Sequence, residues 1–456
     1  MALSADIGIR CIGACVCMYL PKHQHLQLCY QQAPLATNLE ALYQGLLQQA
    51  VPLKHRLAEY DLFGISLSLS DALSRSLLEP EHGQALHSFL NQTALHLLSL
   101  HSSSEKQLGD WRSEARLHYS LRLLDILGGL LPDVMEGSID TVVFSRDTWH
   151  KEAVSSAPVS NQAIQTASRE ARESSAQLGS SHSPSPTISS ATNSIGDTQA
   201  GDTQAGQAAL QQASAHLMQC VAALWRWRQR GKVMYLGLEP SANSLLSNSQ
   251  QLCAFFQDYL LQSGADSLAE SLHISPERAR QLVQEHVRIC FDASYFASRF
   301  ESAQSVLENF SKLGIRLAKL QLSAALCCDL HNAAHHAEIS RRLRLLAQQN
   351  RYVVQRDIDA QLQHFPDIAS ALEHLHNRKA SEWRIDMHLP LYFPASEAMH
   401  ASQSYIQSCF RIVRSKQRGC VLEIESHPSV LINEEPDWLE SREREYRWVL
   451  HQLDSL

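Results

Sequence analysis

Four predicted strands of this chain end on acidic or amide side chains. These side chains are Glu239 in VMYLGLEP, Asp292 in RICFDAS, Gln321 in RLAKLQLS, and Glu423 with Glu425 in VLEIES. Such apolar runs are typical of strands buried on both faces in a parallel sheet. Each acid could serve only as the cap of a following helix. Because the tips of parallel strands meet at one edge, the four tips together favour a shared polar pocket for a metal ion, a polar ligand or proton transfer.

The elements that must position these residues alternate between strands and helices. Strands are predicted at 27–33, 62–70, 94–101, 138–145, 233–238, 288–291, 317–322 and 420–424. Helices are predicted at 39–60 with a break at Pro52, 71–78 capped by Asp71, 82–91, 110–131, 207–228, 249–262, 267–286, 301–313, 338–349, 397–415 and 438–453, and residues 383–392 are predicted to be extended. This alternation predicts an α/β fold, a (β/α)8 TIM barrel. No GxGxxG or GxxxxGK[ST] motif follows a strand, which disfavours an open nucleotide-binding sheet.

One long segment interrupts the alternation. Residues 152–206 consist mainly of Ser, Ala, Gln, Thr and Gly and contain the tandem repeat GDTQAGDTQAG. A segment with so few large apolar residues cannot bury enough surface to offset its ordering entropy. We therefore predict a disordered surface-loop insertion at 152–206, which divides the barrel into a first half at 27–151 and a second half at 207–456 with a C-terminal helix, after a divergent lead-in at 1–26.

The amino-acid composition limits the kinds of partner and the cellular compartment that we expect for this chain. The net charge of −8 disfavours a general nucleic-acid binder, and no apolar run reaches the ~20 residues that a membrane helix needs, so no stable membrane insertion is expected. The 11 cysteines include no CxxC pair, and several lie in apolar runs. This pattern is typical of a reducing compartment, and we expect a cytoplasmic protein.

Several stretches from Asp110 onward carry a resemblance to known proteins. They are DWRSEARLHYSLRLLDILGGLLP, GSIDTVVFS, YLGLEPSANSLL, VRICFDASYFASRFES, GIRLAKLQLSAAL, WRIDMHLPLYF, VLEIESHPSVLI and EREYRWVL. In this order, between Asp110 and Leu450, the chain resembles the xylose-isomerase-like TIM barrels and, within them, the EboE-type metabolite traffic proteins. The resemblance implies a barrel that binds a small polar metabolite at its C-terminal mouth and takes part in processing or trafficking it, with other proteins of the same pathway as partners.

The resemblance also implies a ligand set for a divalent metal ion. Matched position by position, the metal ligands are Glu239, Asp292, Gln321, His388 and Glu425. Carboxylate and amide oxygens suit manganese or magnesium better than zinc. The chain departs from the family pattern at Tyr295 and Asp386, where relatives carry histidines. The remaining roles that we predict are catalytic for Glu239 and Glu425, and substrate-binding for Tyr295, Gln321, Asp386 and Glu423.

Two other functions compete with metabolite binding. One is a metal-dependent isomerase, epimerase or lyase on a sugar-like carbonyl substrate, in which Glu239 and Glu425 bridge the metal or move the proton. The other is a degenerate barrel that serves as a scaffold for partner proteins. Tyr295 in place of histidine favours the metabolite binder and the scaffold over the enzyme. The segment Cys327–His331, with His335 and His336, is predicted to be a solvated loop after the seventh strand rather than a metal site.

Overall fold

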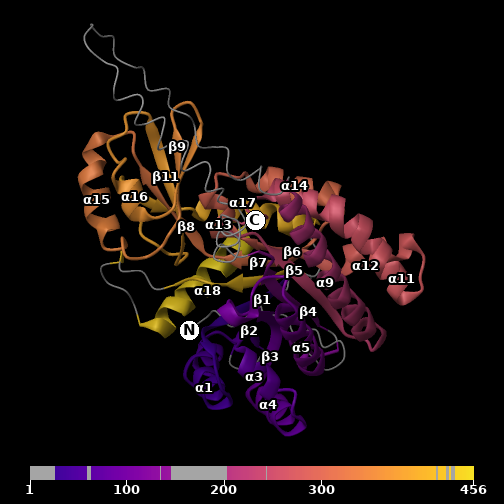
Figure 1. Cartoon of the computed structure of the whole chain (residues 1–456). Coiled ribbons are helices and arrows are strands. Elements are labelled where there is room, and N and C mark those ends of the chain that lie inside the picture. The colour runs from indigo at the N-terminus through magenta and orange to yellow at the C-terminus, as the bar shows by residue number, and fades with distance from the viewer. Residues whose placement is uncertain are drawn as a thin grey trace, which may run out of the picture.

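The structure is a computed structural model that describes residues 26–58, 63–133, 135–144, 203–242, 244–416, 420–427, 431–432 and 437–455. Eight parallel strands close into a barrel in the order β1-β13-β7-β6-β5-β4-β3-β2 (Figure 1). Their bounds are β1 Leu26–Ala36, β2 Phe63–Leu69, β3 Leu95–His101, β4 Glu136–Val142, β5 Val233–Glu239, β6 Val287–Asp292, β7 Leu317–Leu322 and β13 Cys420–Ile424. The predicted TIM barrel is thereby confirmed. The predicted lead-in and disordered insertion lie almost entirely outside the described residues.

Helices connect the strands and cover the outside of the barrel. Their bounds are α1 Leu39–Gly45, η1 Leu46–Ala50, α2 Val51–Leu57, α3 Asp71–Ser76, α4 Pro80–Thr93, η2 Lys106–Leu108, α5 Glu114–Leu130, α9 Gln204–Gln229, α10 Ser249–Phe255, η3 Phe256–Gly264, α11 Ala265–Leu272, α12 Pro276–His286, α13 Ala293–Ser298, α14 Ala303–Lys312, η4 Ala333–His335, α15 His336–Arg344, α16 Ile368–Leu372, α17 Gln403–Lys416 and α18 Trp438–Ser455. Ser275 caps α12 and Pro276 occupies its first turn, as the sequence predicts. None of the helices that the structure describes is long and apolar enough to cross a membrane.

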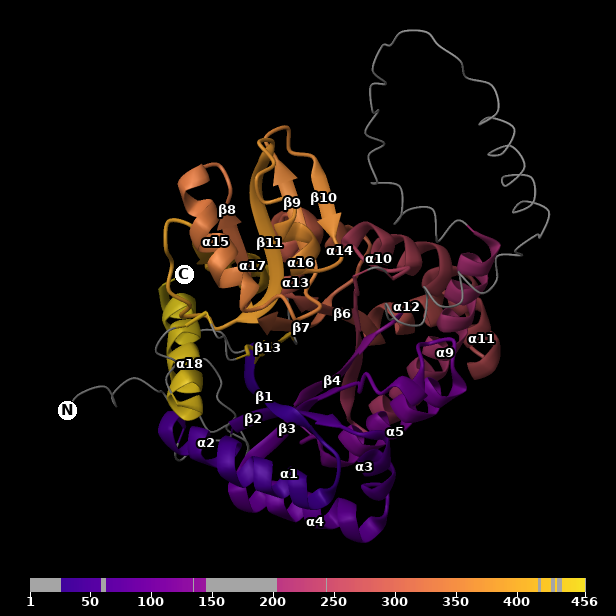
Figure 2. The same cartoon turned by 60° about the vertical axis from the view of Figure 1, so that its left-hand side comes forward.

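Between β7 and α17 the chain builds a second sheet, which is antiparallel and has the order β10-β9-β11-β8-β12. Its strands are β8 Ala324–Asp329, β9 Val353–Asp357, β10 Leu362–Phe365, β11 Ala380–Leu389 and β12 Met399–Ala401. Because β8 follows directly after β7, this sheet stands at the C-terminal end of the barrel (Figure 2). The short helix α13 packs against β7, β8 and β11 and so links the barrel to the sheet.

Four local predictions are wrong. The N-cap of α3 is Ser70, whose hydroxyl accepts from the Leu73 N–H, and not Asp71, which is the first residue of the helix. Cys327 and Cys328 lie in the buried strand β8 rather than in a solvated loop, because ALCC is an apolar run that pairs with both β11 and β12. The predicted helix at 397–415 begins only at Gln403, because residues 399–401 pair with β8. The expected break at Pro52 does not occur, since a π-helical turn before it carries the chain from α1 into α2.

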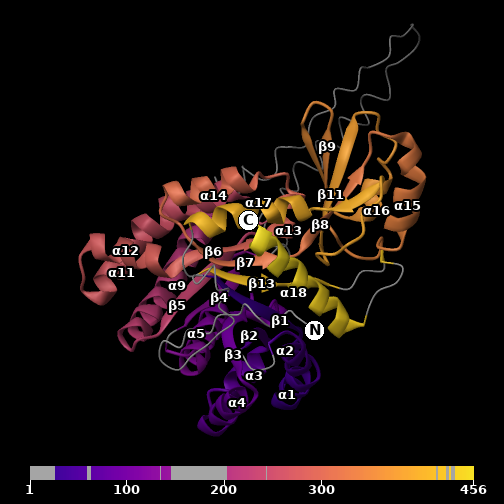
Figure 3. The ribbon, with the colours of Figure 1, turned by 180° about the vertical axis from the view of Figure 1, so that it is seen from behind.

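The C-terminal helix fixes the tip of the last barrel strand. In Figure 3 α18 lies beside β13, with α2 nearby. The buried Glu445 carboxylate accepts from the Ser426 hydroxyl at 2.7 Å, and Arg442 Nη2 donates to the Ser426 carbonyl at 2.5 Å. Because Ser426 directly follows Glu425, this network holds the Glu425 backbone in place at the barrel mouth.

Candidate functional site

The polar side chains inside the barrel form two groups. The inner cluster consists of His101, Asp140, Lys319 and Glu423. The outer cluster, nearer the C-terminal mouth, consists of Glu239, Asp292, Gln321, Asp386, His388 and Glu425. Strand alternation explains the two levels, because Lys319 and Gln321 on β7, like Glu423 and Glu425 on β13, lie two residues apart and therefore face the same side of the sheet.

The inner cluster is a closed network of charges. His101 Nδ1 lies 2.5 Å from Asp140 Oδ2, and His101 Nε2 lies 2.8 Å from Glu423 Oε1. Lys319 Nζ lies 2.5 Å from Asp140 Oδ1 and 2.9 Å from Glu423 Oε2. Lys319 and Glu423 are both 0% exposed. Each cation therefore bridges both carboxylates in an environment without solvent.

Charge in the inner cluster is balanced. Burial would lower the pKa of Lys319, but Asp140 and Glu423 raise it well above its ordinary value. The same carboxylates outweigh burial at His101 and raise its pKa. Against the opposing effect of burial, the two cations lower the pKa of Asp140, and they lower the pKa of Glu423 to about 2. A lysine ammonium held between two carboxylates is a poor nucleophile, and the geometry is that of a structural ion network.

Sequence reasoning missed three members of the inner cluster. His101 ends β3 and Asp140 is its partner in register on β4, whereas Lys319 lies within the apolar run RLAKLQL. A lysine flanked by apolar residues on a strand predicted to be buried needs an internal carboxylate partner, and that signal was available. The identity of its partners depends on strand register and could not be deduced from the chain.

In the outer cluster, Asp292 both caps a helix and faces a histidine. Its Oδ1 accepts from the backbone N–H groups of Ser294 and Tyr295 at 2.8 and 3.1 Å, which caps α13. Its Oδ2 lies 3.7 Å from His388 Nε2. The Asp292 carboxylate therefore fills both roles considered for an acid at a strand tip: it caps a helix, and it belongs to the polar cluster at the barrel mouth.

The antiparallel sheet brings two further polar groups to the mouth. Asp386 and His388 lie on the same face of β11, and His388 Nε2 is 3.6 Å from Asp386 Oδ1. The Ser294 hydroxyl donates to Asp386 Oδ1 at 2.5 Å, and Ser323 Oγ lies 3.1 Å from His388 Nδ1. His388 has a φ of +48°, a strained conformation for a residue with a side chain. The imidazole is thus fixed by contacts from the barrel and the sheet together.

The outer cluster carries more acid than cation. Burial and the charges of Glu425, Asp140 and Asp292 raise the pKa of Glu239 well above its ordinary value. Burial, aided by Asp386 and Glu425, raises the pKa of Asp292 to about 7 despite His388. The pKa of Glu425 is raised, again mainly by burial. Neighbouring carboxyls add to the effect of burial at Glu239 and Asp292, whereas the charges of His101 and His388 oppose burial at Glu425.

Only one side chain of the outer cluster supplies positive charge. Burial would lower the pKa of His388, but the charges of Asp386, Asp292 and Glu425 raise it to about 9. Glu425 Oε2 and Gln321 Oε1 are buried and have no hydrogen-bond partner among the described residues. Unpaired buried acceptors are costly, so the outer cluster has room for a cation or for hydrogen-bond donors.

Two predicted substrate-binding residues have their polar groups occupied by the protein itself. The Tyr295 hydroxyl donates to the Ser247 carbonyl at 2.7 Å, and the residue is 7% exposed. Glu423 belongs to the inner cluster and is bound by Lys319 and His101. Direct contact of either residue with a ligand stays a prediction, as do the roles of the other site residues.

The donor set fits a divalent cation that prefers oxygen. The ligand atoms of Asp292, Asp386 and His388 lie within 4.8 Å of one another. On neighbouring strands Gln321 is the register partner of Asp292, and it supplies an amide oxygen that has no partner. Oxygen donors with a single imidazole suit magnesium or manganese. A second group, Asp140 with Glu239 and Cys290, fits less well because Lys319 already neutralises Asp140.

Comparisons with known proteins bear on the fold. No protein-family model matches the chain, and no curated protein matches it. Among solved structures, it is similar to a xylose isomerase-like TIM barrel protein from Mycobacterium smegmatis in complex with magnesium, with a TM-score of 0.43, 12% identity, and coverage of 92% of this chain and 97% of that one. A xylose isomerase domain protein from Planctomyces limnophilus gives a TM-score of 0.41, 8% identity, and coverage of 94% and 97%.

A third similar structure is a xylose isomerase domain protein from Alicyclobacillus acidocaldarius, with a TM-score of 0.39, 10% identity, and coverage of 94% of this chain and 100% of that one. At such low identity these similarities concern the fold alone, and the barrel itself is established by the strand pairing of this chain. The narrower EboE-type assignment stays a prediction.

Proposed function

We propose that this chain is an EboE-like barrel that binds a small polar metabolite at its mouth together with a magnesium or manganese ion. The observation that carries the proposal is the surplus of acceptors in the outer cluster. The carboxyls of Asp292 and Asp386 share one imidazole, His388, and Glu425 Oε2 and Gln321 Oε1 are buried without a partner among the described residues. A bound cation offsets the negative charge and satisfies the unpaired oxygens in one step.

Each residue of the outer cluster has a role in this proposal. Asp292, Gln321 and Glu425 would hold the ion through oxygen, and His388 through Nε2. Ser323 Oγ, 3.1 Å from His388 Nδ1, orients the imidazole through its other ring nitrogen, and Asp386, 3.6 Å from Nε2, would lie beside the ion. When bound, the ion would polarise a carbonyl or hydroxyl oxygen of the metabolite. Glu239 remains free to accept a hydrogen bond or a proton from the metabolite.

A second candidate function is isomerisation or epimerisation of a sugar-like carbonyl compound, or a lyase reaction on it. It is favoured by the opposition of Glu239 and Glu425, which come from strands separated by β6 and β7 in the barrel and influence one another's charge. Two carboxyls held across a pocket can remove a proton beside a carbonyl and return it elsewhere. A protein that serves only as a scaffold for partner proteins does not require two such carboxyls, so we place the scaffold function third.

Metal binding is tested by calorimetric titration of the EDTA-treated protein with manganese chloride. One ion per chain is expected for the unmodified protein, and Glu425→Gln should lower the affinity at least tenfold. Glu443→Gln, which changes an ion-paired glutamate on α18, is the matched control and should bind as the unmodified protein does. Absence of manganese binding by the unmodified protein refutes the metal part of the proposal.

The metabolite part needs a separate measurement. Mass spectrometry of small molecules released from the freshly purified protein should find a polar compound that Glu239→Gln no longer retains. Proton exchange into that compound in deuterated water, followed by NMR, separates the two functions. Exchange at a carbon beside the carbonyl supports the isomerase, whereas retention without exchange supports the binding protein.

A further inference from the structure

A cavity lies outside the barrel. Its volume is about 850 Å³, and its walls come from α14, α17 and the antiparallel sheet. None of the residues that line it belongs to the inner or the outer cluster. A volume of this order is typical of sites for small molecules.

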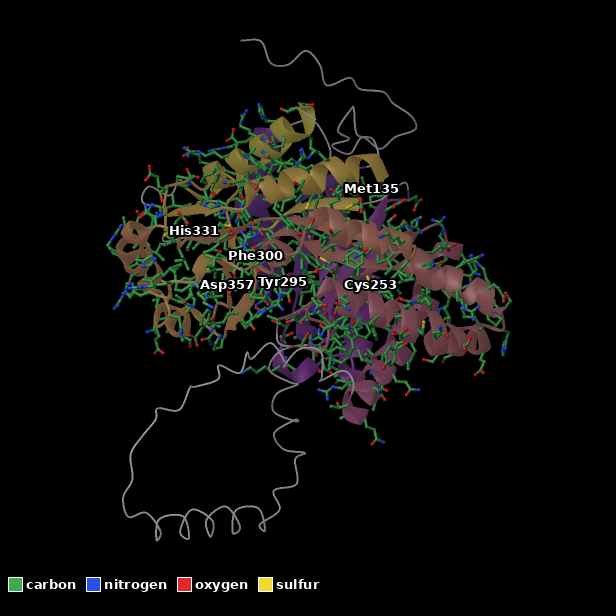
Figure 4. All side chains as sticks on the ribbon, turned by 90° about the horizontal axis from the view of Figure 1, so that it is seen from above. Met135, Cys253, Tyr295, Phe300, His331 and Asp357 are labelled. Atoms are coloured by element: carbon green, nitrogen blue, oxygen red, sulfur yellow. The ribbon has the colours of Figure 1, made fainter. Side chains whose placement is uncertain are left out.

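The floor of the cavity is an aromatic ring with two guanidinium groups over it. The Phe300 ring centroid lies 4.2 Å from the Arg384 guanidinium carbon and 4.7 Å from that of Arg356 (Figure 4, where Phe300 is labelled between the helices and the sheet). Both arginines bind the same carboxylate, Glu382, at 2.7 and 2.6 Å. One carboxylate cannot neutralise two guanidinium groups. The floor itself therefore keeps one uncompensated positive charge; elsewhere in the lining Arg411 adds a third guanidinium group, and Glu301 and Glu308 add two carboxyl groups.

The backbone at Phe300 is strained. Its φ is +60°, and it occupies the position after α13 where helices usually carry glycine. The Phe300 N–H bonds to the Ala297 carbonyl and the Glu301 N–H to the Phe296 carbonyl, which is the hydrogen-bond pattern of a glycine-terminated helix. A bulky side chain is rare in this conformation, and strain of this kind is concentrated at functional sites. The ring that stacks under the two arginines is the reason to keep phenylalanine there.

The wall facing the floor offers polar atoms without partners. Glu301 Oε2 accepts from the Ser249 backbone N–H at 3.2 Å and from the Ser249 hydroxyl, but Glu301 Oε1 is buried and has no partner among the described residues. The Tyr405 hydroxyl is likewise buried and unpaired within the described part of the chain. Both residues line the cavity, so an occupant with hydroxyl groups could satisfy them.

We propose that this cavity binds a phosphate monoester of a polyol, such as a sugar phosphate. The guanidinium N–H groups of Arg356 and Arg384 match the oxygens of a phosphate group, and the Phe300 ring keeps their planes in place. Glu301 Oε1 accepts from one hydroxyl group of the polyol, and the Tyr405 hydroxyl donates to another. The site is distinct from the barrel mouth, although Arg384 lies on the same face of β11 as Asp386 and His388.

The test is a calorimetric titration of the full chain with glucose 6-phosphate, with glucose and inorganic phosphate as separate probes. Glucose 6-phosphate should bind one molecule per chain, at least tenfold more tightly than either fragment. Arg356→Met should weaken glucose 6-phosphate at least fivefold. Arg344→Met, a substitution of an exposed arginine on α15, should change nothing.

The variant Phe300→Gly separates a ligand site from a merely structural arrangement. Glycine relieves the left-handed backbone, so thermal stability should be retained, while glucose 6-phosphate affinity should fall at least tenfold because the arginines lose their support. Unchanged affinity in both Phe300→Gly and Arg356→Met overturns the proposal. It is also overturned if glucose 6-phosphate binds no better than phosphate, or if Glu425→Gln at the barrel mouth abolishes the binding.

Discussion

The inner and outer clusters are built from the same kinds of residue and share β7 and β13, yet their charges are balanced differently. In the inner cluster two cations stand between two carboxylates, and every charged atom has a partner of opposite sign. In the outer cluster the acids outnumber the cations, and two acceptor oxygens are left without donors. Two features make the difference: β7 places Lys319 at the inner level but the neutral Gln321 at the outer one, and the outer level holds four carboxyl groups where the inner one holds two.

This contrast indicates that the outer cluster, and not the inner one, needs a bound ion or ligand to complete it. A balanced buried network is expensive to break, because removing one partner leaves an uncompensated charge in the core. An unbalanced network destabilises the empty protein and is kept where a ligand completes it. The following predictions test the contrast, in order of decreasing effect.

Removal of the Lys319 ammonium should have the largest effect. Lys319→Met keeps the length of the side chain but leaves Asp140 and Glu423 sharing only His101, so the free energy of unfolding should fall by about 3–5 kcal/mol. Urea denaturation followed by circular dichroism measures the loss.

The double variant Lys319→Met with Glu423→Gln is the control for this prediction. It removes one charge of each sign and should recover part of the lost stability, since the two residues act as a pair. A loss below ~1 kcal/mol in Lys319→Met contradicts the description of the inner cluster as an ion network that stabilises the core.

Manganese should stabilise the protein through the outer cluster alone. At a free concentration one hundred times the dissociation constant, a ligand that binds only the folded state adds about 2.7 kcal/mol to the free energy of unfolding. Thermal unfolding with manganese chloride, and again after EDTA is added in excess, measures this gain and its reversal. Glu425→Gln should show little of the gain, whereas an equal gain in that variant places the ion elsewhere.

The sequence revealed the barrel and most of the outer cluster because both depend on local pattern. β7 and β13 have the predicted bounds, since an apolar run between polar positions marks a buried strand. Glu239, Asp292 and Glu425 were identified because they stand at or just beyond strand tips. Pairing between distant strands could not be predicted from the chain, and so three of the four members of the inner cluster, which joins β3, β4, β7 and β13, were missed.

The antiparallel sheet was missed for a related reason. β8 pairs with β11 more than fifty residues later, and its adjacent cysteines have the appearance of a loop when that partner is unknown. The environment of Tyr295 also depends on a distant segment, because its hydroxyl donates to Ser247 in the connection after β5. Residue type alone therefore predicted a ligand-facing phenol, whereas the structure shows one bound to the backbone.

Tyr295→Phe tests that difference. Loss of the hydroxyl leaves the buried Ser247 carbonyl without its donor, which should cost about 1–3 kcal/mol of unfolding free energy. Manganese affinity should change less than twofold, because the phenol points to Ser247 rather than to the outer cluster. Thermal unfolding and calorimetric titration of the same preparation check both outcomes. A tenfold loss of manganese affinity would instead indicate that Tyr295 contributes to the metal site.

The smallest effect on stability is expected for Glu425→Gln, and its matched partner is Glu423→Gln, two residues away on the same strand. Glu423 binds Lys319 and His101 at full burial, so neutralising it should cost about 3–5 kcal/mol. Glu425 Oε2 has no partner among the described residues, so neutralising Glu425 should change stability by no more than about 0.5 kcal/mol without metal. Because strand, side-chain length and amide substitution are the same in both variants, urea denaturation of the pair isolates the charge balance of each level. Equal losses of unfolding free energy in the two variants would mean that the charges of the outer cluster are as well balanced as those of the inner cluster. That result would contradict the need for a bound cation.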